Sequence, residues 1–172
     1  MTASEITTRV QEMLEALNVD EDTVRRLADN MWFSPYDLFA IAEALEKLNV
    51  ANSEVFVALV ADADSFDLAK FHRYRAELLA NESVREHLGT LGEFVVVSDM
   101  VLNRNNEGAL VAAFPLDVVA WTESVQANFT RFGDEIAVES EAIPPIFAVT
   151  GDVTETANSE MQRRGWTLIG MD

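Results

Sequence analysis

Histidine is the residue type best suited to metal binding and proton transfer near neutral pH, and the chain has two, His72 and His87. Their spacing of fifteen residues corresponds to roughly 22 Å of rise if one helix carries both. That distance is too long for a shared metal ion or a proton relay, so we expect two ordinary polar residues. Because the chain has no cysteine, it cannot form disulfides, thiolate metal sites or a cysteine nucleophile.

Acidic residues at positions 62, 64 and 67 have the alternating spacing that begins a calcium-binding loop. The segment lacks the central glycine of such a loop. Arg73 occupies the twelfth position, where a calcium loop has a bidentate glutamate. We therefore predict no metal site, and we expect these carboxylates to cap or shield a helix that starts near Phe66.

Thr150-Gly151-Asp152 lies where a predicted strand passes into a predicted helix, which is the edge where open α/β sheets bind ligands. One glycine is not a phosphate-binding motif, and the nearby carboxylates would repel a phosphate. We expect Asp152 and Glu155 to form a capping box instead. An enzyme, hydrolase-like and built from scattered carboxylates near Asp152 with His72 or Arg73, is kept as the alternative function. No pattern predicts a cofactor.

The pattern of residues 1–92 predicts about five helices. Apolar residues recur at helical spacing from Ile6 to Leu17, with Ser4 as the expected N-cap. Ser34-Pro35 is a strong start signal for a further helix. The segment 55–60 is assigned to a helix with Ser53 as its cap. A long helix is expected over 66–88, which residues 81–83 could interrupt.

Residues 93–172 predict a ββαβαβ region with a small mixed sheet. The expected strands are 94–102, 109–114, 146–150 and 166–171, with an antiparallel first pair and a parallel last pair. We expect a turn over 103–108, a helix opened by Pro115 and a loop over 134–145. The fold class is therefore α+β or α/β, with a helical N-terminal half packed on this layer, and one compact unit is expected.

The chain of 172 residues has 30 acidic and 12 basic side chains, which gives a formal net charge of −18. A field this negative repels nucleic acids and anionic membranes, so neither is an expected partner. Adaptation to salt would produce the same acidity, and the sequence does not separate the two causes. No segment resembles a signal peptide or a membrane span, so we predict a cytoplasmic location.

Only one short stretch is basic, and it contains Lys70, Arg73 and Arg75. These side chains either neutralise acids within the fold or form a docking stripe for an acidic partner. Phe33 precedes the predicted cap at Ser34 and suits a hydrophobic staple. Trp32 is then either a core residue or an exposed anchor for a partner.

The absence of a catalytic motif, beside ample apolar surface, favours a non-enzymatic protein-binding module of adaptor, chaperone or immunity type. Its expected partner is another protein or a second copy of itself, and homo-oligomers are therefore possible. The candidate docking residues are Trp32, Phe33, Lys70, Arg73 and Arg75.

Overall fold

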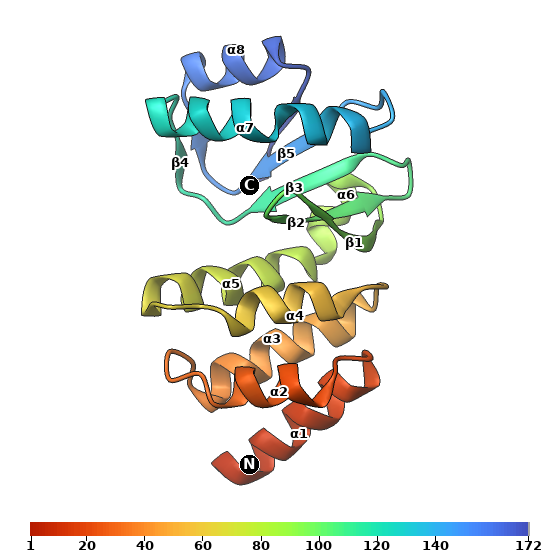
Figure 1. The fold of residues 1–172 in the computed structure, drawn as a ribbon, viewed down its shortest axis with the longest axis vertical. Coiled ribbons are helices and arrows are strands. Elements are labelled where there is room, and N and C mark those ends of the chain that lie inside the picture. The colour runs from red at the N-terminus through yellow and green to blue at the C-terminus, as the bar shows by residue number, and fades with distance from the viewer. Residues whose placement is uncertain (172) are drawn as a thin grey trace. The chain divides into compact units, whose positions relative to one another are not determined.

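A computed structural model describes residues 1–171 of the chain. It has two compact units, a helical unit at Met1–Asn81 and an α/β unit that begins at Glu82. Figure 1 shows the helices of the first unit and the strands and helices of the second. The predicted order, helices first and then alternating strands and helices, is confirmed.

The helical unit contains five helices, and local capping explains where they begin. They are α1 (Ala3–Ala16), α2 (Glu21–Ala28), α3 (Pro35–Leu48), α4 (Ser53–Ala61) and α5 (Phe66–Leu79). Ser34 caps α3 as predicted, with Pro35 at the first helical position and a reciprocal bond to Asp37. Two other predicted caps are wrong by one or two residues, since Thr2 replaces Ser4 and Asn52 replaces Ser53.

The core of the helical unit is formed by the apolar stripes of its helices. Each helix turns one face inward because apolar residues recur every three or four positions. The buried members include Ile6, Leu14, Leu27, Ile41, Leu45, Phe56 and Val60. The predicted long helix over 66–88 ends at Leu79. The next helix, α6 (Glu82–Leu88), belongs to the α/β unit.

The α/β unit is built on a five-stranded mixed sheet. The strands lie in the order β1 (Leu91–Val97), β2 (Met100–Asn105), β3 (Leu110–Phe114), β5 (Ile146–Val149) and β7 (Thr167–Gly170). The first three strands pair antiparallel, and β3, β5 and β7 pair parallel. The predicted antiparallel first pair and parallel last pair are therefore confirmed. Two short strands, β4 (Val118–Val119) and β6 (Asp152–Val153), form a separate parallel pair.

The predicted strand over 94–102 is wrong, because two strands and a tight turn share that segment. Val97 pairs with Met100, which leaves only Ser98 and Asp99 to reverse the chain. Ser98 adopts a φ of 55°, a conformation usually supplied by glycine or asparagine, so the sequence contains no clear turn signal. The expected turn over 103–108 begins only after Asn105. The side-chain oxygen of Asn105 accepts hydrogen bonds from the backbone of Glu107 and Ala109.

Two expectations for the segment after β3 are also wrong. Pro115 does not open a helix, since α7 (Glu123–Glu139) begins at the N-cap Thr122, and β4 lies between them. The expected loop over 134–145 is helical as far as Glu139. Ile136 is buried there, and burying this side chain with the sheet outweighs the helix-weakening Gly133 and the run of acids.

One face of the sheet forms a core with α7 and α8 (Glu155–Arg163), both of which lie on the same side of it (Figure 1). Leu102, Leu110 and Phe147 of the sheet pack with Ile136 of α7 and Met161 of α8. Trp166, predicted as a core residue, is buried, and its ring meets Phe129 at 5.4 Å between centroids. This packing holds α7 and α8 against one face of the sheet.

Candidate docking surface

Among the predicted docking residues, the structure buries two and leaves three at least partly accessible. Trp32 is 37% exposed and its neighbour Phe33 is 8% exposed. Phe33 is thus a core residue, in keeping with its expected staple position, and Trp32 is the accessible aromatic. Lys70 is exposed and Arg73 is half-buried, whereas Arg75 is only 2% exposed.

Arg75 therefore contributes no accessible surface to a basic stripe, which corrects its assignment as a docking residue. Its guanidinium lies over the ring of Phe56, with 5.6 Å between the guanidinium carbon and the ring centroid. Burial lowers the pKa of Arg75 to about 10, because an apolar environment disfavours the charged form. Proximity in the sequence placed Arg75 with Lys70 and Arg73, but it did not reveal which of these side chains lies on the face of α5 that packs inward.

Arg73 connects two helices of the helical unit. Its guanidinium donates to Asp37 of α3 at 2.8 Å and to Glu77 of α5 at 3.3 Å. Hydrogen bonding to Asp37 raises the pKa of Arg73. Partial burial opposes ionisation of Asp37, but hydrogen bonds from Ser34 and Arg73 outweigh it and hold its pKa below the usual value. Arg73 thus neutralises acids of its own chain, which is one of the two roles that the sequence predicted for the basic stretch.

Lys70 lies on the solvent side of α5 with two exposed aromatic residues. Its ammonium nitrogen is 4.5 Å from the centroid of the Phe66 ring, a cation–π contact. Phe66 is 52% exposed and Tyr74 is 50% exposed. This side of α5 therefore combines two exposed aromatic rings with the ammonium group of Lys70.

The loop between α2 and α3 is held in place by Asn30, a residue that the sequence did not single out. Its side-chain amide donates to the carbonyl oxygens of Ala61 at 3.1 Å and Ala63 at 2.9 Å. Its oxygen accepts a bond from the Trp32 backbone at 2.9 Å. With the loop anchored in this way, Met31 projects outward and is 81% exposed.

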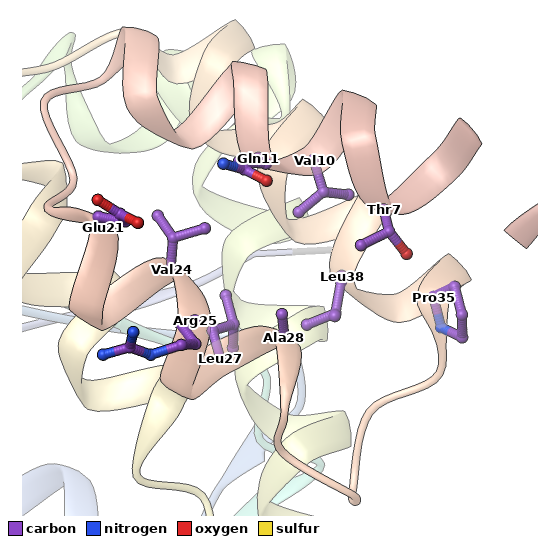
Figure 2. A pocket seen from close by; sticks show the side chains of 10 residues that line it. All are labelled: Thr7, Val10, Gln11, Glu21, Val24, Arg25, Leu27, Ala28, Pro35 and Leu38. Atoms are coloured by element: carbon purple, nitrogen blue, oxygen red, sulfur yellow. The ribbon is translucent and has the colours of Figure 1, made fainter. Parts of the chain in front are cut away.

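A hollow of about 240 Å³ lies beside this loop, between α1, α2 and the start of α3. We call it the α1–α2 hollow. Val10 of α1 and Val24 of α2 are on its facing walls in Figure 2. Ala28, at the end of α2, and Pro35, at the start of α3, also line it. The loop between Ala28 and Pro35 contains Met31 and Trp32. The complete lining is Thr7, Val10, Gln11, Glu21, Val24, Arg25, Leu27, Ala28, Pro35 and Leu38.

The polar groups around the α1–α2 hollow are mostly engaged within their own helices. Thr7 donates to the carbonyl of Ala3 at 3.0 Å, and Gln11 donates to Glu15 at 2.8 Å. Small-molecule sites usually measure about 300–1,000 Å³ and contain several convergent polar groups. The hollow is smaller and mostly apolar, so its dimensions suit one apolar side chain from another protein.

The backbone near Asp152, the segment considered for the alternative enzyme, is engaged in pairing within the chain. The Asp152 N–H donates to the carbonyl of Asp117 at 2.8 Å, and β6 pairs with β4. A Cβ at Gly151 would lie 1.9 Å from that carbonyl oxygen, so this glycine permits close approach of the chain's own backbone. The predicted capping box is wrong, because Thr154 caps α8 and its hydroxyl accepts from Ala157 at 3.3 Å.

His72 is buried rather than placed on the surface, at 4% exposure. Its ring packs edge-on against Phe56 and Phe71, and within residues 1–171 neither ring nitrogen has a hydrogen-bond partner. Desolvation, assisted by the nearby charge of Arg75, lowers the pKa of His72 to about 4. This histidine is therefore neutral near pH 7 and is enclosed by aromatic rings.

Residues 1–171 contain no cluster of three or more metal-ligating side chains. No helix in that part of the chain is long and apolar enough to cross a membrane. Comparisons of the chain with protein-family models, with curated proteins and with solved structures found no match.

Proposed function

We propose that this protein is a non-enzymatic docking module that binds a partner protein through its helical unit. One observation carries the proposal. An apolar hollow sized for one side chain lies between α1, α2 and the start of α3, and the loop that joins its lining residues Ala28 and Pro35 carries Met31, the most exposed large apolar side chain among residues 1–171. A pocket that accepts an anchor residue, with apolar groups around it, is the usual centre of a protein interface.

The chain's charge supports a basic partner rather than the acidic one considered for the Lys70 stripe. The formal net charge is −18, and Arg73 and Arg75 are engaged or buried within the fold. Opposite charge on a partner would accelerate its encounter with this surface, and the effect would weaken as salt increases. Glu21, at one end of the hollow in Figure 2, adds a local negative charge, and Arg25 of the same lining is paired with Asp22 of its own helix.

The experiment compares two variants that add the same bulk at two exposed helical alanines. Ala28→Trp fills the α1–α2 hollow, whereas Ala127→Trp lies on α7, which contributes no residue to the lining of that hollow. Each full-length protein is immobilised and exposed to an extract of the native cell, and captured proteins are identified by mass spectrometry. Thermal melts establish that both variants are folded.

We expect at least one captured protein to be lost with Ala28→Trp and retained with Ala127→Trp and the wild type. Sedimentation of the three proteins alone tests whether the partner is a second copy, in which case Ala28→Trp would weaken self-association. Equal capture and equal sedimentation by both variants would exclude the hollow as the docking site.

A further inference from the structure

The α/β unit leaves one edge of its sheet open beside α7. β1 is an edge strand of the five-stranded sheet, and β2 is its only neighbouring strand among residues 1–171. A groove of about 300 Å³ lies between the end of this strand and the C-terminal half of α7, and we call it the β1–α7 groove. Its lining includes Val96 and Val97 of β1 and Asp134, Glu135, Val138 and Glu139 of α7.

The backbone of Val96 directs a hydrogen-bond donor and an acceptor toward the open edge. Val97 and Met100 flank the two-residue turn of the hairpin, so these two residues exchange hydrogen bonds with each other. Bonded and non-bonded pairs alternate along an antiparallel ladder, so the N–H and C=O of Val96 point away from β2. β1 also contains neither proline nor lysine, the residues that commonly protect an edge strand from pairing with another chain.

Two valines with exposed side chains lie at this edge. Val96 is 54% exposed and Val138 of α7 is 76% exposed. Val97 packs into the core that α7 shares with the sheet, so Val96, the preceding residue of the strand, projects from the opposite face. A strand laid beside β1 would therefore meet two environments, because one of its faces would lie beside the Val96 side chain and the other beside α7.

The α7 side of the groove is acidic, because every ionisable residue of its lining is a carboxylate. Arg104 lies 3.7 Å from Glu139 and already balances that charge. Asp134 and Glu135 form no ion pair within residues 1–171, since Arg131, one turn earlier on α7, stacks on the aromatic ring of its neighbour instead. These two unbalanced carboxylates favour basic side chains on the α7 side of an added strand.

We propose that the β1–α7 groove binds an extended segment of a partner protein in which basic residues alternate with apolar ones. The segment pairs with the backbone of Val96 and adds a strand to the sheet. Its basic side chains lie toward Asp134 and Glu135, and its apolar side chains lie beside Val96. A second copy of this chain is not the occupant, because its short basic stretch is part of the helix α5. The groove belongs to the α/β unit and does not depend on docking at the α1–α2 hollow.

The test follows the binding of three pentapeptides to the full chain by amide chemical shifts at pH 7 and low salt. The probe is acetyl-Lys-Val-Lys-Val-Lys-amide. One control is the same peptide with both valines N-methylated, which removes the donors that would pair with Val96. The other control, acetyl-Lys-Lys-Val-Val-Lys-amide, has the same charge without the alternation. We expect saturable shifts over 95–98 and 134–139 with the probe, and at least fivefold weaker binding of each control, because a lost hydrogen bond or charge contact weakens binding by about that factor. Absence of saturable shifts, or equal affinity for either control, would overturn the proposal.

Two exposed glutamates of α7 provide a matched pair of variants. Glu135→Gln should weaken binding of the probe about fivefold, because it removes one charge contact of the groove. Glu123→Gln makes the same change in the first turn of α7, outside the lining, and should leave the affinity within twofold. Thermal melts establish that both variants are folded. Equal weakening by both variants would mean only a general attraction of basic peptides to the acidic chain, and would overturn the site.

Discussion

His72 should make the helical unit sensitive to mild acid. Its pKa is about 4 in the folded chain, against about 6.5 for an exposed histidine. Between these values the unfolded chain binds a proton that the folded chain excludes, so stability is complete above pH 6.5 and is lost as pH falls towards 4. At 1.36 kcal/mol per pH unit, the loss between pH 7.5 and pH 4.5 is about 2.5 kcal/mol.

The variant that tests this reasoning is His72→Leu. Leucine is apolar, is similar in size to histidine and cannot be protonated. Its matched control is His87→Leu, the same change at the exposed histidine. Urea unfolding followed by far-ultraviolet circular dichroism at several pH values gives the free energy of unfolding. The measurements stop at pH 4.5, because Asp20 and Asp37, whose pKa values are lowered by hydrogen bonds, contribute only at lower pH.

Between pH 7.5 and pH 4.5, the free energy of unfolding of the wild type should fall by about 2.5 kcal/mol more than that of His72→Leu. His87→Leu should retain the wild-type pH dependence. Neither ring nitrogen of His72 has a partner within residues 1–171, so His72→Leu leaves no polar group unsatisfied and should be stable at pH 7.5. Identical pH profiles for wild type and His72→Leu would refute the assignment of acid sensitivity to this side chain.

Three further predictions concern packing and partners. Trp32→Ala should cost less than about 2 kcal/mol of stability, whereas Phe33→Ala at the adjacent buried position should cost about 3–5 kcal/mol; thermal melts showing the reverse order would make Trp32 a core residue. Gly151→Ala should lower the melting temperature of the α/β unit, since its Cβ would collide with the Asp117 carbonyl, and an unchanged melt would show that the backbone relaxes freely. Duplex DNA should not bind saturably near physiological salt in an anisotropy assay, because phosphate contacts need clustered cations and Arg75 is buried.

The elements that follow from short-range chemistry were predictable. Ser34 and Pro35 start α3 because a hydroxyl satisfies free backbone N–H groups and proline has the helical φ. The apolar runs around positions 94, 110 and 147 became strands of the sheet. The turn at Ser98-Asp99 was not predictable, because the left-handed conformation of Ser98 is imposed by the pairing of Val97 with Met100. Acids near Asp134 suggested a loop, but burial of Ile136 keeps that segment helical.

The sequence by itself determined the acidic character, the division into a helical part and an α/β part, and the lack of cysteine chemistry. These properties depend on composition and on periodicity within single segments. Tertiary structure alone decided that Arg75 and His72 are buried while Trp32 stays accessible, and that Asn30 anchors the loop beside the α1–α2 hollow. Burial and hollows arise where several distant segments meet. The apolar pattern of one helix indicates the face that turns inward, but it does not show which other segments will cover polar residues such as Arg75 and His72.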